Sequence, residues 1–345
     1  MKFLKNILIS LFISVIVFML VEIPFRVYDY EFKYKNLKSW FYQGKIPISF
    51  EEIMVYHFKT GRVVRDPDLI WRHKYSEEHP LDSIGIRTCK RKEISCLKDC
   101  DVYRIIIFGG SHPFGLYLKY EDTYAYRLEE LFRNKQREWD KKIQVINASI
   151  PGYSTLQALN LLKYHMIHYN PDLVIIDAGN NDGLQLCRSW PWRDSEIVGT
   201  MSTLQCRVLN ILEKSSFFWY FREFLYKIKH SIIVNKNKVN DIELTRVSKE
   251  ENKNNLEEIK KLAYSNNFKV IFLSQVTMDG VGQLRRGFGA VVEPYLDIYG
   301  KLKNRSDIKD YFLDSIHGSA KGHREIAKII YDYLKADIMQ SELKK

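Results

Sequence analysis

The 345-residue sequence contains no internal repeat and no low-complexity tract, which argues against repeat architectures and compositionally biased chains. It lacks the G-x-x-x-x-G-K-[ST] motif of phosphate-binding loops, and Gly109, Gly110 and Gly115 miss the dinucleotide-binding spacing. No group of His, Cys, Asp and Glu has the spacing of a metal site. We therefore expect neither nucleotide-dependent nor metal-dependent chemistry, and no cofactor.

Cysteine is scarce, with five residues in the whole chain. Cys89, Cys96 and Cys100 form a cluster without the paired C-x-x-C spacing of a structural zinc site, and Cys187 and Cys206 flank a later loop. In an oxidising compartment, a Cys187–Cys206 disulfide and one pair from the cluster are plausible. Unpaired cysteines without a role are the equally weighted alternative.

Acidic residues are outnumbered, because 42 Asp and Glu stand against 53 Lys and Arg, for a formal net charge of +11. Such a balance suits phosphate-rich polymers or lipid headgroups. However, the basic residues are scattered and no nucleic-acid-binding motif accompanies them. A solvated basic surface is the favoured interpretation, and nucleic acid is not an expected partner.

Only one long hydrophobic run is present, and it lies at the N-terminus. Residues 7–23 follow Lys2 and Lys5 and form an apolar stretch of 17 residues, near the lower limit for crossing a bilayer. A cleaved signal peptide is the alternative, but no small-x-small cleavage site follows. We predict an uncleaved signal anchor with one transmembrane helix, occupying residues 1–24.

The side of the membrane is not decided by charge, because basic residues flank both ends of the apolar run. Long domains that follow an N-terminal anchor are translocated largely regardless of their own charge. A Cys187–Cys206 disulfide would also require an oxidising compartment. We therefore expect a single-pass protein of the cell membrane whose catalytic domain is periplasmic or extracellular.

The remaining chain divides into a connector, residues 25–100, and a domain, residues 101–340. In the domain, runs typical of strands (104–108, 143–147, 173–177 and 269–274) alternate with helical patterns near 122–137, 154–168, 246–266 and 320–334. This order predicts a parallel sheet covered by helices on both faces, with its site at the carboxyl ends of the strands.

Residues 185–250 interrupt this rhythm and are interpreted as an insertion. The aromatic run 217–226 within them is expected to be helical. It is suited to core packing, to a cap over a pocket, or to a membrane-surface helix, and the sequence leaves these alternatives open.

Ser111 lies at the first strand-to-helix junction. The buried-type strand 105–108 is followed directly by Gly109, Gly110 and Ser111, and then by a helical pattern. A strand, a tight turn and a helix hold a serine hydroxyl out of a sheet edge as a nucleophile. By itself, Gly-Gly-Ser is also an ordinary turn.

Three further turns supply what acyl transfer requires at the same edge of the sheet. His317 is the expected base, because imidazole titrates near neutral pH, and Asp314 is placed to orient it. The backbone N–H groups of Ser111 and Gly152 and the side-chain amide of Asn181 are the expected oxyanion donors.

These four blocks together resemble the SGNH hydrolases, also called the GDSL esterase/lipase family. The blocks are Phe108-Gly-Gly-Ser-His-Pro-Phe-Gly115, Asn147-Ala-Ser-Ile-Pro-Gly152, Gly179-Asn-Asn-Asp182 and Asp314-Ser-Ile-His317. The layout, with Gly85-Ile-Arg87 upstream, is similar to a membrane-anchored bacterial type. The resemblance implies a three-layer α/β/α sandwich with a five-stranded parallel sheet. One departure is Gly110, where the family usually carries aspartate.

The predicted function is that of a membrane-anchored serine esterase that hydrolyses an acyl or acetyl ester of a small molecule, lipid or glycan. Ser111, His317 and Asp314 are its predicted catalytic residues. Two alternatives stay open: an O-acyltransferase that passes the acyl group to a cell-surface glycan, and a catalytically silent binding or scaffold protein, which Gly110 motivates. The oligomeric state is not readable from the sequence.

Overall fold

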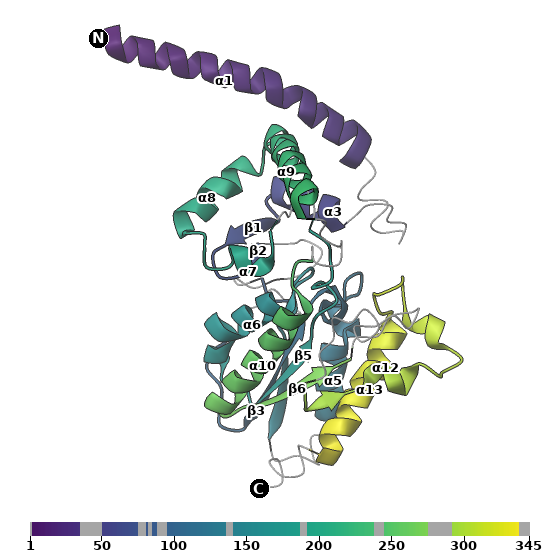
Figure 1. Cartoon of the computed structure of the whole chain (residues 1–345). Helices are drawn as coiled ribbons and strands as arrows, with labels where there is room; N and C mark the ends of the chain where they lie inside the picture. Colours follow the sequence, from purple (N-terminus) through teal and green to yellow (C-terminus); the bar gives the residue numbers. More distant parts are fainter. Residues whose placement is uncertain are drawn as a thin grey trace. The chain divides into compact units, whose positions relative to one another are not determined.

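The computed structural model (Figure 1) describes residues 2–34, 50–74, 81, 85–87, 95–135, 141–186, 192–237, 245–274 and 292–337. The chain forms two compact units. We call them the N-terminal unit (Met1–Arg65, Cys187–Pro191 and Ser202–Val239) and the sheet unit (Asp66–Leu186, Trp192–Met201 and Asn240–Lys345). All predicted site residues belong to the sheet unit.

The sheet unit is built on five parallel strands in the order β4-β3-β5-β6-β7. Their bounds are β3 Val102–Gly109, β4 Lys142–Asn147, β5 Leu173–Asp177, β6 Lys269–Leu273 and β7 Tyr295–Leu296. Ile105 of β3 pairs with Val145 of β4 on one side and with Leu173 of β5 on the other. The predicted α/β fold with a five-stranded parallel sheet is confirmed. The sequence did not reveal β7, because two residues are too short for a periodic pattern.

Helices cover both faces of this sheet (Figure 1). α5 packs with α13 on one face, and α6 packs with α10 on the other. The helices of the sheet unit are α4 Ser111–Phe114, α5 Tyr124–Asn134, α6 Thr155–Tyr164, α7 Asp194–Ile197, α10 Lys249–Ser265, α12 Ile298–Leu302 and α13 Ala320–Asp337, with 3₁₀ turns at Tyr120–Asp122, Met166–Tyr169 and Ile308–Tyr311. A further strand, β2 (Ile70–His73), precedes them.

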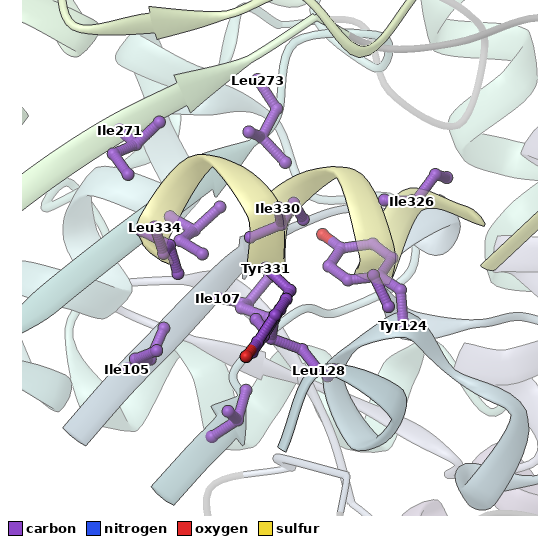
Figure 2. Close-up of a cluster of buried hydrophobic side chains, with 14 of the residues drawn as sticks. Ile105, Ile107, Tyr124, Leu128, Ile271, Leu273, Ile326, Ile330, Tyr331 and Leu334 are labelled. Carbon is purple, nitrogen blue, oxygen red and sulfur yellow. The ribbon is translucent and has the colours of Figure 1, made fainter. Parts of the chain in front are cut away.

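The core between the sheet and the α5–α13 pair is apolar (Figure 2). Alternate residues of β3, such as Ile105 and Ile107, point to this face, as the period of two in a strand requires. Ile330 and Leu334 of α13 lie four residues apart, on one side of the helix, and are at most 1 % exposed. This packing fixes α13, and with it the turn that precedes the helix and carries His317.

The predicted helices differ from the observed ones mainly at their ends, where polar side chains cap them. α5 begins at Tyr124 rather than near 122, because the Thr123 hydroxyl accepts a hydrogen bond from the N–H of Tyr126. The helix predicted at 154–168 ends at Tyr164 and continues as a 3₁₀ turn. Ser248 and Glu251 form a capping box that starts α10.

The N-terminal unit contains α1 (Lys2–Tyr28), a π-helical turn (Asp29–Tyr34), α3 (Phe50–Lys59), most of β1 (Val63–Asp66), α8 (Thr203–Leu212) and α9 (Ser216–Asn237). The Glu22 carboxylate of α1 accepts hydrogen bonds from the Ser215 hydroxyl and from the N–H groups of Ser216 and Phe217, at 2.6–2.9 Å. These donors lie at the start of α9, so a carboxylate of α1 satisfies the free N–H groups of another helix.

α1 carries exposed apolar side chains along most of its length, including Ile9, Phe12, Ile13, Val17, Phe18, Leu20 and Ile23. The transmembrane helix predicted within residues 1–24 is not found: among the residues that the structure describes, no helix combines the length and apolar character needed to cross a bilayer.

The expected cysteine pairing is corrected in part. Cys96 and Cys100 are both exposed free thiols. Any pair drawn from the cluster of three would include at least one of them, so no disulfide forms within it. Cys206 is buried on α8, and the Cys187–Cys206 pairing lies outside what can be described, because Cys187 is not among the described residues.

The aromatic run 217–226 forms part of α9, as expected, and its side chains are partly buried and partly exposed. Trp219 is buried, and its indole N–H donates to the carbonyl of Glu213 at 2.7 Å. Phe221 and Phe224 are instead 47 % and 58 % exposed. Core packing therefore explains one side of this helix and leaves the other side in solvent contact.

Candidate active site

The turn that carries Ser111 is shaped by the close approach of neighbouring backbone. At Gly109, a Cβ atom would lie 2.1 Å from the carbonyl oxygen of Asp177 and 2.5 Å from Cγ of Pro113. Only glycine allows β3 to end this close to the end of β5 while α4 folds back over it. Ser111 is the first residue of α4 and lies two residues beyond the carboxyl end of β3.

Ser111, His317 and Asp314 lie within hydrogen-bond reach of one another. Nε2 of His317 is 2.9 Å from Oγ of Ser111, and Nδ1 of His317 is 2.6 Å from Oδ2 of Asp314. With Nδ1–H donating to the carboxylate, Nε2 presents its lone pair to the serine hydroxyl. The structure thus brings the predicted nucleophile, base and orienting carboxylate together, although Ser111 and His317 are 206 residues apart in the sequence.

Asp314 is held by its own turn as well as by the imidazole. Its Oδ1 atom accepts hydrogen bonds from the N–H groups of Ile316 and His317, at 2.9 and 2.7 Å. Burial alone would raise the pKa of Asp314, but the hydrogen bonds and the His317 imidazole outweigh it, so the pKa lies below its usual value. The carboxylate is therefore ionised at neutral pH and able to stabilise an imidazolium.

The expected oxyanion donors lie on the adjoining turns. Gly152 has φ +83°, in the left-handed region that glycine adopts without strain. The Asn181 amide nitrogen donates to the carbonyl of Tyr153 at 2.9 Å, which orients the amide and leaves its second N–H for another acceptor.

Gly110 is explained by the position of Asn181. A Cβ atom at residue 110 would lie 2.5 Å from Nδ2 of Asn181. The backbone angles of Gly110, φ −93° and ψ −145°, do not include a positive φ, so the need for glycine here is steric. The departure from the family pattern thus makes room for the Asn181 amide beside the nucleophile turn.

We predict that Gly110→Ala lowers kcat by ~10- to 100-fold with little change in KM, because the methyl group pushes the Asn181 amide away from its position. Steady-state kinetics on an activated ester measures the effect. The matched control is the same substitution in an Asn181→Ala background, where the clash no longer exists. A loss of kcat that is equally large in that background would contradict the explanation.

A buried ion pair from the insertion braces the Gly152 turn, and sequence analysis did not identify it. Arg246 donates to the carboxylate of Asp194 from Nε and Nη2, at 3.1 and 2.8 Å, and from Nη1 to the Gly152 carbonyl at 2.8 Å. Both side chains are at most 2 % exposed. In the sequence, Asp194 and Arg246 are single charged residues within the insertion, to which no role could be assigned. Because they lie 52 residues apart, no local pattern indicates that they pair.

A second buried carboxylate belongs to Asp182, the residue that follows Asn181. It accepts hydrogen bonds from the N–H and hydroxyl of Thr155, at 2.8 and 2.5 Å, and from the Asn252 amide at 2.8 Å. Burial raises the pKa of Asp182 to about 6, against the lowering effect of these hydrogen bonds. The carboxyl group therefore ties the start of α6 and α10 to the turn that carries Asn181.

This pKa predicts a pH dependence of folding. A carboxyl group whose pKa is raised by folding stabilises the folded state below its unfolded pKa, near 3.8, and this contribution is lost as the pH rises through about 6. The free energy of unfolding of the natural protein should therefore fall, relative to that of Asp182→Asn, by up to about 3 kcal/mol between pH 4 and pH 7. Urea unfolding of both proteins measures this difference. A constant difference over that range would contradict it.

His112 and His323 are placed away from the serine hydroxyl, as structural residues. Nδ1 of His112 lies 3.1 Å from Oδ2 of Asp177, and the hydroxyl of Tyr124 donates to the same oxygen at 3.0 Å. Nδ1 of His323 accepts from the N–H of Tyr124 at 3.0 Å. Burial, with the nearby charges, holds the pKa of His323 well below its usual value. This network anchors the residue after Ser111 to the end of β5.

No group of three or more His, Cys, Asp or Glu side chains suited to holding a metal ion is found among the described residues. The polar groups of the site are those needed to move a proton and to bind an oxyanion.

The sequence matches the family profile described as GDSL-like lipase/acylhydrolase over residues 119–330. The matched range includes Gly152, Asn181, Asp314 and His317 and begins after Ser111. Comparison with curated proteins finds no significant match.

Several solved structures are similar to this chain. TesA is 16 % identical, with 67 % of this chain and 98 % of that chain covered and a TM-score of 0.42. A lipase/acylhydrolase from Enterococcus faecalis is 17 % identical, with 68 % and 95 % covered and a TM-score of 0.42. A two-domain esterase active on acetylated mannans is 19 % identical, with 68 % and 49 % covered and a TM-score of 0.42.

Proposed function

We propose that the chain, which belongs to the GDSL-like lipase/acylhydrolase family, is a serine esterase with Ser111 as its nucleophile. As a member of this family, it is a hydrolase that acts on ester bonds. The observation that carries the assignment of residues is the hydrogen-bonded chain from Asp314 through His317 to Oγ of Ser111.

In the proposed reaction, Oγ of Ser111 attacks the ester carbonyl carbon while Nε2 of His317 takes the hydroxyl proton. The N–H groups of Ser111 and Gly152 and the Asn181 amide stabilise the negative oxygen of the tetrahedral intermediate. The imidazolium then protonates the leaving alkoxide as the carbon–oxygen bond breaks, which releases the alcohol and leaves an acyl-serine. Water, deprotonated by His317, attacks this ester and releases the carboxylic acid and free Ser111.

Labelling with a fluorophosphonate probe tests this proposal. Oγ of Ser111 should become phosphonylated, with loss of the fluoride, and the modified peptide should be identified by mass spectrometry. Ser149 is a matched control, because it lies on a neighbouring turn but is fully buried with its hydroxyl turned to the Ile107 carbonyl. Folded protein that is labelled at neither serine would overturn the proposal.

We propose an acyl or acetyl ester of a carbohydrate or lipid as the substrate class. The family contains lipases and acylhydrolases, which supports an ester substrate of this class but does not identify the acyl group or the alcohol. Incubation with an acetylated sugar and a fatty-acyl ester, with and without a sugar acceptor, identifies the products. Free acid indicates hydrolysis, whereas a new ester on the acceptor indicates acyl transfer.

We propose further that the N-terminal unit associates with a membrane and that the sheet unit lies outside the cytoplasmic membrane. The exposed apolar side chains of α1 support the membrane association. External protease added to spheroplasts should digest the sheet unit while the protein remains in the membrane fraction. Full protection from protease, or recovery of the protein in the soluble fraction, would contradict this.

A further inference from the structure

The loop that follows the nucleophile helix contains a residue in an unusual backbone conformation. Tyr117 has φ +71°, in the left-handed region that bulky residues rarely occupy. The end of α4 does not require a left-handed conformation at Tyr117, because Gly115 already makes the left-handed turn that ends this helix. A strained conformation of this kind persists only where the surrounding structure imposes it.

Arg87 binds three backbone carbonyls of this segment. Its guanidinium donates from Nη1 to the carbonyls of Phe114 and Gly115, at 2.6 and 2.8 Å, and from Nη2 to the carbonyl of Leu118. These carbonyls lie on both sides of Tyr117. The Arg87 residue is 1 % exposed, and within the described part of the chain its hydrogen bonds go only to backbone carbonyls.

Burying a guanidinium without a carboxylate partner is costly. Burial lowers the pKa of Arg87 to about 10, so it remains charged at neutral pH. The chain thus keeps a buried cation whose hydrogen bonds go to the loop that follows α4. A planar fork of donors is suited to joining several carbonyls at once, and a lysine ammonium is not.

The side chain of Tyr117 meets the predicted base. Its ring centroid lies 5.3 Å from that of the His317 imidazole, at an interplanar angle of 85°. Such an edge-to-face contact is a favourable aromatic geometry and limits rotation of the imidazole. Burial and the nearby Asp314 raise the pKa of Tyr117 to about 12, so the phenol adds no charge beside the imidazole over the working range of an esterase.

We propose that Arg87 and Tyr117 are positioning residues for the base: Arg87 braces the loop of residues 114–118, and the braced loop holds the Tyr117 ring against the His317 imidazole. Asp314 and Ser111 fix the imidazole within its own plane through hydrogen bonds at its two nitrogens. The Tyr117 ring restricts the remaining rotation. This inference rests on the proposed function, because it assigns the imidazole as the base.

Three substitutions at residue 117 separate the ring, the hydroxyl and the backbone. With p-nitrophenyl acetate, Tyr117→Phe should keep kcat within about twofold, because the ring contact survives. Tyr117→Ala and Tyr117→Gly should both lower kcat by ~10- to 100-fold with KM little changed. Tyr117→Gly should nevertheless melt about 2–4 °C above Tyr117→Ala, because glycine removes the left-handed strain.

Arg87→Lys tests the brace and retains the positive charge. We expect it to lower kcat by a similar factor to Tyr117→Ala, and to have little further effect when it is combined with Tyr117→Ala. Tyr264→Ala, at a 91 % exposed position on α10, and Arg305→Lys, in a surface ion pair, are the matched controls and should be neutral.

Failure of this inference is distinguishable from failure of the proposed function. If the natural protein neither hydrolyses the ester nor reacts with a fluorophosphonate at Ser111, the proposed function fails. If the natural protein is active and Tyr117→Ala keeps its kcat, the positioning role of Tyr117 is overturned. If Arg87→Lys lowers kcat equally in the presence and absence of the Tyr117 ring, Arg87 does not act through that ring.

Discussion

Ser111→Ala and His317→Ala should each lower kcat by ~10⁴-fold or more, because the nucleophile and base act as a unit and neither retains function without the other. Asp314→Asn should cost a comparable factor, since an amide at this position no longer favours the imidazole tautomer that leaves Nε2 free to accept the proton. Hydrolysis of p-nitrophenyl acetate under saturating conditions measures all three.

The non-additivity of these changes is a sharper test than their size. The Ser111→Ala/His317→Ala double variant should be no less active than either single variant, within about threefold, because the residual rate comes from the oxyanion donors and binding. Unchanged melting temperatures would show that the losses are chemical. Full activity of Ser111→Ala would end the assignment of Ser111, and multiplicative losses would show that the two residues act independently.

Asn181→Ala should lower kcat by ~10²–10³-fold and leave KM nearly unchanged, because the amide stabilises charge that exists only in the tetrahedral intermediate. Asn181→Asp is a useful companion variant, since it keeps the size of the side chain but replaces the donor with an anion beside the developing oxyanion. It should be at least as inactive as Asn181→Ala.

A rise in KM with kcat unchanged would instead make Asn181 a residue that positions substrate. The rate of fluorophosphonate labelling provides an independent reading, because phosphonylation also develops negative charge on an oxygen. It should slow in Asn181→Ala and remain fast in Asn180→Ala, the neighbouring residue on the same turn.

Much of the architecture was predictable from local sequence. The runs at 104–108 and 173–177 are mostly apolar and rich in β-branched residues, and such runs form strands buried on both faces. Alternation with helical patterns then requires parallel connections, and parallel strands bring their carboxyl ends to one edge. The juxtaposition of Ser111 with Asn181 follows from this rule.

Other features were not accessible in this way. β7 contains two residues and exists because its backbone pairs with β6, so no hydrophobic period marks it. The N-terminal unit also combines Met1–Arg65 with Ser202–Val239, and no change in composition along the sequence indicates that these segments belong together. Helix ends depended on capping side chains such as Thr123, which shift a boundary by one or two residues.

Local periodicity and the direction of the strands were enough to predict the parallel α/β fold and the order in which serine, glycine, asparagine and histidine reach one edge of the sheet. The packed fold was needed to show why residue 110 is glycine, which residues brace Gly152, and what the Tyr117 ring contacts. Each of these depends on contacts of a few ångströms between side chains far apart in the chain, such as the Asn181 amide over Gly110 and the Arg246 guanidinium at Gly152. A one-dimensional pattern contains no such distances, whereas the packed fold determines them.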